Sequence, residues 1–402
     1  MKKINIYPIR SLMGHGDMIS EDSKLLLDEL RKRLSGFEIA FSDSPKGLAG
    51  EGLPLILVQS GGSEGIFLKD VYPLFKGPYY LLTYGSCNSL AASLEILTFL
   101  KDRNESSEVL HGDYDYIASR IRLLSEGNQR KIEARLGILG EPSDWLISSA
   151  VDKKQCQEKL GITLVDIPEN EVIEAIKAVK LEEVRGEENF DYDHAEIKKA
   201  LRIYEGLKTI VAKYDLKGFT IRCFDIIQAV KSSACLALAL FNKDGILATC
   251  EGDVPAMLTA YLLLDKYGIH AFQANPQWID PVANTVELAH CTLPLDMTKK
   301  VVYDTHFESG IGVGIHGELD LGPVTIVKLS ADMREFYCEE GTLTQNDYRK
   351  DRCRTQVKIA LDAPVSYFLT SSLGNHHQII YGHHKEEIKS YLQGLGMRNV
   401  VA

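Results

Sequence analysis

Residues 79–100 read YYLLTYGSCNSLAASLEILTFL, and this segment identifies the type of sheet in the protein. Its apolar run over 79–83 predicts a buried strand that ends in a polar Ser/Gly loop, and residues 90–100 then have the pattern of a helix. The run over 53–59 is a second example, because it ends in Ser60-Gly61-Gly62-Ser63. Buried strands that alternate with helices predict a parallel sheet, which holds its ligands at the polar strand ends.

The same alternation begins again in the middle of the chain. Residues 219–224 and 246–250 are apolar runs, and a long amphipathic helix is predicted over 194–214 before them. A turn-forming cluster over 140–144 separates this region from the first. We therefore predict a second α/β domain.

The last hundred residues have a different pattern. Short β-branched or alternating segments over 301–303, 324–329 and 357–361 are separated by Gly, Pro and Asp turns, which predicts a small barrel-like β domain. A helix over 385–392, stopped by Gly394, is expected to close it. The predicted fold class is α/β, with two parallel-sheet domains followed by a β-rich, barrel-like domain. Their predicted limits are residues 1–150, 151–270 and 271–402.

Composition excludes several classes of protein. The 402 residues include 45 Lys+Arg and 56 Asp+Glu, and a net charge of -11 argues against a nucleic-acid-binding surface. The hydrophobic share of 45% and the charged share of 25% exclude a disordered, collagen-like or coiled-coil protein. The densest apolar run, 234–241, is too short to span a membrane. We expect a cytoplasmic protein whose eight cysteines are reduced, mostly buried thiols, with neither nucleic acid nor membrane as partner.

Common nucleotide and hydrolase motifs do not explain the chain. Residues 312–317 match Gly-x-Gly-x-x-Gly, but β-like segments lie on both sides, whereas a dinucleotide site needs a strand before the motif and a helix after it. The sequence contains no P-loop motif and no His-Glu-x-x-His.

Polar clusters gather after residue 245. Glu251 and Asp253 follow the apolar strand predicted over 246–248, which places two carboxylates at its carboxyl end. Acidic residues at a helix N-terminus are favourable in any case, so capping explains this pair equally well. His290 and His306 also follow short β segments, and seven of the 11 histidines fall in the last 113 residues. This concentration favours one site over unrelated occurrences.

These residue types point to a particular chemistry. Carboxylate and amide oxygens with imidazole nitrogens suit a hard to borderline divalent ion such as Mn²⁺ or Mg²⁺, and no thiolate pair selects zinc. Such an ion holds the vicinal oxygens of a polyol and polarises a carbonyl. A nearby carboxylate then removes the proton alpha to that carbonyl. These parts fit aldose–ketose isomerisation through an enediol, and metal-assisted aldol cleavage uses many of them.

Three motifs resemble the L-fucose isomerase and L-arabinose isomerase superfamily, in particular its shorter fucose isomerase-like members. They are ATCEGDVPAMLT at 248–259, ELAHCTLP at 287–294 and GNHHQ at 374–378, the last followed by Tyr381-Gly382. The resemblance covers about 215–400. It implies two Rossmann-like domains with a β-rich C-terminal domain, and a homotrimer or homohexamer with sites near subunit contacts.

The resemblance also implies a metal site in which a Glu, an Asp and a His hold a divalent ion, usually Mn²⁺. The Glu corresponds to Glu251, and the His to His376, with His377 as the close second. At the position of the Asp stands Asn275, whose carbonyl can bind a metal but cannot act as a general base. Either the second acid lies elsewhere, or the metal is bound weakly, or the chemistry is altered. The alternative acids are Asp253, Asp280 and Glu308.

The predicted site residues fall into three groups. The metal ligands are Glu251, Asn275 and His376, for Mn²⁺ or Mg²⁺. The catalytic residues are Glu251, Asp253 and Glu308. The substrate-binding residues are His290, His306, Asn375, His377 and Arg354. Arg354 suits an anionic group such as a phosphate or sulfonate, although a plain ion pair explains it equally well.

The predicted function is a metal-dependent aldose–ketose isomerase. Its substrate is a small-molecule sugar, either a deoxyhexose, a pentose or a modified sugar such as sulfoquinovose. The alternative is a non-catalytic sugar-binding or regulatory relative, because a fold does not fix a function. Asn275 in the place of an acid supports that alternative.

Overall fold

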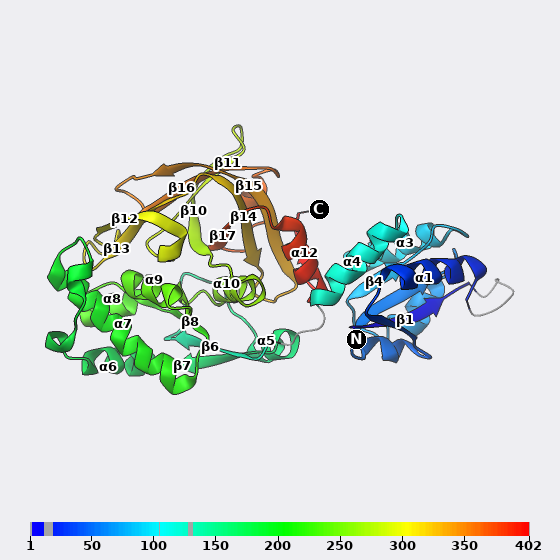
Figure 1. Cartoon of the computed structure of the whole chain (residues 1–402), viewed down its shortest axis with the longest axis horizontal. Coiled ribbons are helices and arrows are strands. Elements are labelled where there is room, and N and C mark those ends of the chain that lie inside the picture. Colours follow the sequence, from blue (N-terminus) through cyan, green and yellow to red (C-terminus); the bar gives the residue numbers. More distant parts are fainter. Residues whose placement is uncertain (1, 12–18, 104, 128–131, 402) are drawn as a thin grey trace. The chain divides into compact units, whose positions relative to one another are not determined.

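The computed structural model describes residues 2–11, 19–103, 105–127 and 132–401. The chain divides into two compact units, which Figure 1 shows in the colours of the sequence. The first unit contains Met1–Lys131 with Glu386–Asn399, and the second contains Ile132–Lys385 with Val400–Ala402. The second unit therefore holds both the central α/β region and the β-rich region. The division into three domains at 150 and 270 stays a prediction.

A five-stranded parallel sheet forms the centre of the first unit. Its strands are β1 (Lys2–Ile9), β2 (Phe37–Phe41), β3 (Leu53–Val58), β4 (Tyr79–Leu82) and β5 (Ser107–Leu110). The short strand β18 (Arg398–Asn399) also falls in the first unit but is not part of this sheet. Its helices are α1 (Glu21–Arg33), α2 (Glu64–Ile66), α3 (Ser89–Lys101), α4 (Tyr114–Gly127) and most of α12 (Lys385–Gly394), with short segments η1 (Pro45–Ala49) and η2 (Phe67–Val71). The sheet order is β2-β1-β3-β4-β5. Because β3 and β4 are buried at every position, apolar side chains face α1 and α4 on one side and α3 on the other.

Helix α12 lies in the first unit, although the sequence predicts that it closes the β-rich domain. A guanidinium nitrogen of Arg120 donates to the hydroxyl of Ser390 at 2.7 Å, and the Tyr80 hydroxyl donates to the carbonyl of Gln393 at 2.7 Å. The amphipathic pattern of α12 requires an apolar partner, but periodicity alone does not say which one. These contacts between distant parts of the sequence determine that α12 packs in the first unit.

The second unit begins with a four-stranded parallel sheet in the order β7-β6-β8-β9. Its strands are β6 (Ala134–Leu139), β7 (Ile162–Ile167), β8 (Gly218–Ile221) and β9 (Leu247–Cys250). Its helices are α5 (Lys153–Leu160), α6 (Glu169–Ala178), α7 (His194–Tyr214), α8 (Cys223–Val230), α9 (Cys235–Lys243) and α10 (Val254–Tyr267), with η3 (Leu181–Glu183) and η4 (Glu187–Asn189). Asp253 caps α10 by accepting from the backbone N–H of Ala256 at 2.8 Å, and Gly268 ends it at φ +66°.

A closed antiparallel barrel completes the second unit. Its strands are β10 (Phe272–Asp280), β11 (Thr285–His290), β14 (Gly322–Leu329), β15 (Glu335–Asp347), β16 (Thr355–Leu361) and β17 (His377–Tyr381). The order is β14-β17-β10-β11-β16-β15, and pairing of β14 with β15 closes the ring. The hairpin of β12 (Thr298–Asp304) and β13 (Gly314–Leu319), η5 (Leu295–Met297) and α11 (Tyr367–Thr370) are attached to it. The predicted fold class, with two parallel sheets and a barrel-like β region, is confirmed.

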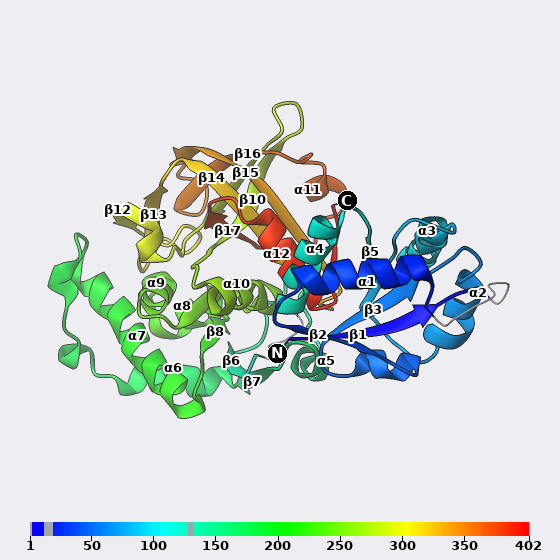
Figure 2. The ribbon, with the colours of Figure 1, turned by 45° about the vertical axis from the view of Figure 1, so that its right-hand side comes forward.

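Helices α9 and α10 lie between the barrel and the central sheet, as Figures 1 and 2 both show. Two glutamines of the barrel connect the layers. Gln273 of β10 accepts from the backbone N–H of Cys250 at 2.9 Å, and Gln378 of β17 donates to the carbonyl of Ala256 at 3.0 Å. The polar face of β10 and β17 is therefore turned toward the carboxyl end of β9.

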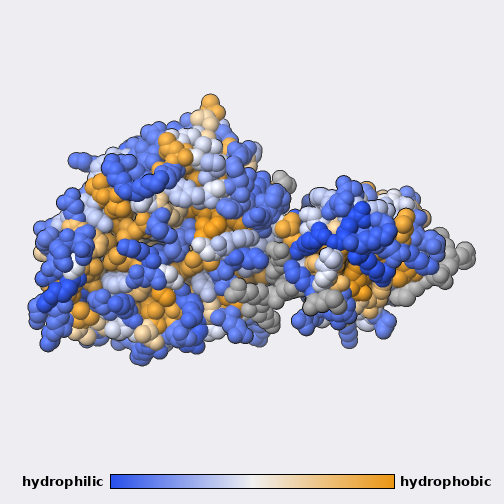
Figure 3. Space-filling view, viewed as in Figure 1, coloured by the Kyte–Doolittle hydropathy of each residue, from blue (hydrophilic) through white to orange (hydrophobic). Residues whose placement is uncertain are grey.

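The surface in Figure 3 is largely hydrophilic, with apolar atoms at the tip of the hairpin between β10 and β11. Trp278 and Val282 are exposed in that hairpin. No single helix among the described residues is long and apolar enough to cross a membrane. Only α8 and α9 pass that test together, and they are bent by 120°.

Candidate metal centre and active site

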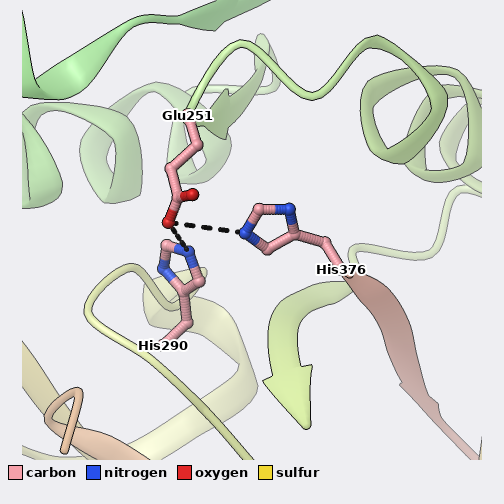
Figure 4. A group of neighbouring side chains, drawn as sticks. All are labelled: Glu251, His290 and His376. Carbon is pink, nitrogen blue, oxygen red and sulfur yellow. Dashed lines mark ion pairs between the residues drawn. The ribbon is translucent and has the colours of Figure 1, made fainter. Parts of the chain in front are cut away.

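Glu251, His290 and His376 meet at the face where the central sheet and the barrel adjoin (Figure 4). The Oε1 atom of Glu251 lies 3.5 Å from Nε2 of His290 and 3.5 Å from Nε2 of His376. One ligand atom from each residue lies within 4.8 Å of the other two. Residues that are 125 positions apart in the sequence thus converge on one point.

The backbone at Glu251 is held in an unusual conformation. Glu251 has φ +65°, in the left-handed region that non-glycine residues seldom occupy, and Gly252 follows at φ +71°. A Cβ on Gly252 would lie 2.8 Å from Cα of Pro142, so no larger residue fits there. The backbone N–H of Ser143 donates to the Glu251 carbonyl at 3.2 Å. Strain of this kind persists where the surroundings hold it, and here it turns the carboxylate toward the imidazoles.

Both imidazoles are fixed through their Nδ1 atoms. Nδ1 of His376 lies 2.8 Å from Oδ2 of Asp253, which in turn lies 3.4 Å from Nζ of Lys328. Nδ1 of His290 lies 3.0 Å from the hydroxyl of Thr292. Partners on Nδ1 orient an imidazole so that Nε2 points at its ligand, as they do around bound metals.

The charges of the site are strongly coupled. Burial alone would raise the pKa of Glu251, but the two neighbouring imidazoles hold it far below its ordinary value. Burial opposes the charged form of His376 as well, yet Asp253 and Glu251 raise the pKa of its imidazole to about 9. For Asp253, the charge of Lys328 and the contact with His376 overcome burial and hold the pKa well below its ordinary value. Both carboxylates are therefore ionised at neutral pH.

The donor atoms fit a divalent ion. Nε2 of His290 and Nε2 of His376 are shielded from solvent and have no hydrogen-bond partner within the described part of the chain. The same holds for Oδ1 of Asn275, whose residue pairs with Ala289 in the register of β10 and β11. Atoms bound at about 2.1 Å to one ion lie about 3 to 4 Å apart, which is the spacing seen between Glu251 and each imidazole. Buried nitrogens without partners are costly unless a ligand uses them.

His377 and Asn375 lie outside this cluster of donor atoms. His377 turns into the barrel, where its Nε2 lies 3.0 Å from the Tyr367 hydroxyl and its Nδ1 lies 2.9 Å from the Asn375 carbonyl. Burial and the charge of Lys328 lower the pKa of His377 to about 3. It is therefore a neutral residue of the barrel interior, and a role for it in substrate binding stays untested.

The loop between β12 and β13 carries two further predicted residues. Nδ1 of His306 lies 3.0 Å from the hydroxyl of Ser309, and Glu308 is exposed. The ring of His306 packs edge-on against Phe224, which packs against Trp145, and the indole N–H of Trp145 donates to Glu251. These contacts place the β12–β13 loop beside the site.

Arg354 and Asp280 are engaged elsewhere. The guanidinium of Arg354 donates to the carbonyl of Thr305 at 2.8 Å and to its hydroxyl at 3.0 Å, and lies 3.6 Å from Asp304. Asp280 accepts from two backbone N–H groups in the exposed β10–β11 turn. Binding of an anionic group by Arg354 stays a prediction, and Asp280 stabilises a turn.

Three residues of the site were not predicted from the sequence. The indole N–H of Trp145 donates to Oε2 of Glu251 at 2.9 Å, while Lys328 and Thr292 support the imidazoles. The position of Lys328 inside the apolar run of β14 is the sequence signal that could have identified it, because a fully buried ammonium requires a charged partner. Trp145 follows the 140–144 turn cluster and carries no comparable signal.

Comparison with known proteins agrees with an enzyme. No family model matches the chain. It is similar to proteins named sulfoquinovose isomerase from Priestia aryabhattai and Priestia megaterium, in each case 21% identical over 378 residues, which cover 85% of this chain and 83% of the relative. A protein of the same name from Clostridium sp. is 23% identical over 206 residues, which cover 47% of this chain and 44% of the relative. The prediction of an isomerase is borne out by these relatives, of which the two Priestia proteins resemble the chain over most of its length.

Proposed function

We propose that the protein is a metal-dependent aldose–ketose isomerase and that its substrate is sulfoquinovose or a closely similar sugar. The observation that carries the proposal is that two buried imidazole nitrogens, which have no hydrogen-bond partner among the described residues, converge on one oxygen of Glu251. The choice of sulfoquinovose as the substrate is supported by the names of the curated relatives. Metal-assisted aldol cleavage would use similar groups, but the relatives' names support isomerisation.

Glu251, His290 and His376 would hold the ion, with the Asn275 carbonyl as a fourth ligand. Mixed oxygen and imidazole donors favour Mn²⁺ or Mg²⁺. When bound, the ion supplies a Lewis acid that polarises the sugar carbonyl and makes the neighbouring C–H more acidic. Asp253 and Thr292 keep the two imidazoles turned toward this point.

We assign proton transfer between the two sugar carbons to a second carboxylate. Glu251 is held ionised so strongly that it is a good ligand and a weak base. Asp253 is fully buried and already bonded to His376, Lys328 and the N-terminus of α10. Glu308 is exposed and lies two residues after His306, whose ring packs against Phe224 beside the site, so we assign the proton transfer to Glu308.

The test is turnover in the presence of defined metals. Protein treated with a chelator would be incubated with sulfoquinovose, D-glucose, L-fucose and L-arabinose, without metal and with Mn²⁺ or Mg²⁺ restored. We expect ketose only with metal, and fastest from sulfoquinovose. Binding of sugar without turnover under every condition would instead establish the non-catalytic relative that Asn275 allows.

A further inference from the structure

A continuous series of aromatic rings begins at Glu251. The indole N–H of Trp145 donates to Oε2 of Glu251, and the Trp145 ring packs edge-on against Phe224, with centroids 5.1 Å apart. Phe224 packs edge-on against His306 at 5.7 Å. Trp145, Phe224 and His306, here called the aromatic wall, therefore lead from the candidate metal centre to the β12–β13 loop.

The turn that carries the first member of the wall is held by hydrogen bonds, but Trp145 itself remains half exposed. Arg222 donates to both carboxylate oxygens of Asp144, at 3.1 and 2.9 Å, and to the carbonyl of Pro142 at 3.1 Å, which fixes the turn that carries Trp145. Trp145 is nevertheless 49% exposed. An indole that is held in place and leaves apolar surface in water, next to ionised groups, has the character of a preorganised binding surface.

The chemistry of such a surface matches a sugar ring. A pyranose has a face of C–H bonds, which packs on the electron-rich plane of an aromatic ring, while its hydroxyl groups remain at the edge for polar partners. Ser309 holds Nδ1 of His306, so Nε2 is the nitrogen left at the far end of the wall for a polar substituent. A ring lying on Trp145 would have its reacting end beside Glu251.

We propose that the aromatic wall is the binding subsite for the carbon ring of the sugar, with Trp145 as its principal contact. This inference rests on the proposed function and adds the residues that hold the substrate. Trp145 also orients Glu251. Its N–H group donates to Oε2 and leaves Oε1 facing the imidazoles.

The chain contains two tryptophans, which makes the proposal directly measurable. Trp278 lies in the exposed β10–β11 hairpin, so a Trp278→Phe variant leaves Trp145 as the single indole. This variant would be loaded with Mn²⁺ and titrated with sulfoquinovose, while calorimetry gives the dissociation constant independently. We expect the emission of Trp145 to change and to saturate with the calorimetric constant.

Two substitutions separate the ring from its N–H group. Trp145→Ala is expected to raise the dissociation constant of sulfoquinovose about tenfold, because the stacking surface is lost. Trp145→Phe keeps a ring and is expected to change that constant less than about threefold, while kcat falls about tenfold because Glu251 loses its N–H donor. Trp278→Ala, the matched control, is expected to change neither quantity.

The possible results test the aromatic wall and the proposed isomerase function separately. If calorimetry shows sugar binding but Trp145 emission is unchanged and Trp145→Ala binds as the wild type does, the wall is wrong and the isomerase proposal stands. If the wild-type protein shows no binding heat with sulfoquinovose and no turnover of any sugar, the proposed function is wrong and the wall as a sugar subsite falls with it.

Discussion

Glu251 uses its two carboxylate oxygens differently. Oε1 faces two imidazoles at 3.5 Å each, and Oε2 accepts from Trp145 at 2.9 Å. A second carboxylate, Glu308, is exposed on a neighbouring loop. We therefore propose that Glu251 holds the metal and that Glu308 moves the proton.

Substitution of the two glutamates tests this separation. Glu251→Gln is expected to weaken Mn²⁺ binding at least about 100-fold and to abolish turnover, because an amide carries no charge for the ion. Glu308→Gln is expected to lower kcat about 100-fold or more while the Mn²⁺ dissociation constant stays within about twofold. Calorimetry and steady-state kinetics measure both. Full turnover in Glu308→Gln would remove that residue from the mechanism.

Asp253 and Lys328 form an ion pair that is almost completely buried. Asp253→Asn would leave the ammonium of Lys328 without its counter-charge, and the expected loss in the free energy of unfolding is about 3 to 5 kcal/mol. Urea denaturation measures it. The double variant Asp253→Asn with Lys328→Met is expected to recover part of the loss. A single-variant loss below about 1 kcal/mol would show that the pair is not structurally important.

At the scale of elements, the alternation of β17 assigns opposite roles to adjacent histidines. His377 pairs with Ala274 in the register of β17 and β10, and Ala274 belongs to the barrel core. The neighbouring side chain, His376, must then face the central sheet, where Asp253 receives it. Strand β17 therefore begins with an interior residue, and the residue directly before the strand belongs to the site.

This alternation predicts different consequences for two adjacent substitutions. His376→Gln is expected to lower Mn²⁺ affinity at least about 100-fold, because the buried Nε2 donor is lost. His377→Gln is expected to leave Mn²⁺ affinity unchanged and to cost about 1 to 3 kcal/mol of unfolding free energy, because the Tyr367 hydroxyl loses its partner. A metal-binding defect in His377→Gln as large as that in His376→Gln would contradict the placement.

The raised pKa of His376 predicts a pH dependence of the metal-free protein. Its folded value, about 9, exceeds the ordinary value of 6.5, so the stabilisation is complete below pH 6.5 and is lost as the pH rises through 9. The expected loss is about 3 kcal/mol. The measurement is the difference in unfolding free energy between the wild type and His376→Gln across this range, and a constant difference would contradict it.

The sequence was sufficient to locate part of this site. Polar residues after apolar strands meet at the carboxyl ends of a parallel sheet, and Glu251 was predicted there for that reason. The choice between His376 and His377 requires the strand register, which no local pattern contains. Trp145 reaches Glu251 from a turn 106 residues earlier, so only the folded chain brings them together.

At the scale of the whole molecule, the candidate centre lies entirely within the second unit, and two layers contribute to it. Glu251 directly follows β9 of the central sheet, while His290 ends β11 of the barrel and His376 directly precedes β17. The first unit has the parallel sheet that its alternating pattern predicts. Assembly into a homotrimer or homohexamer stays a prediction of the resemblance, and a cytoplasmic location stays a prediction from the cysteines.

The central claim is that this centre isomerises a sugar with the help of a metal. The most direct measurement is carbon NMR of sulfoquinovose labelled with ¹³C at C1, in the presence of Mn²⁺-loaded protein. We expect the labelled carbon to change from the anomeric carbon of the aldose to the hydroxymethyl carbon of the corresponding ketose. A chelator or the Glu251→Gln substitution is expected to stop this conversion. A label that stays anomeric with the loaded protein, or that moves equally fast in Glu251→Gln, would contradict it.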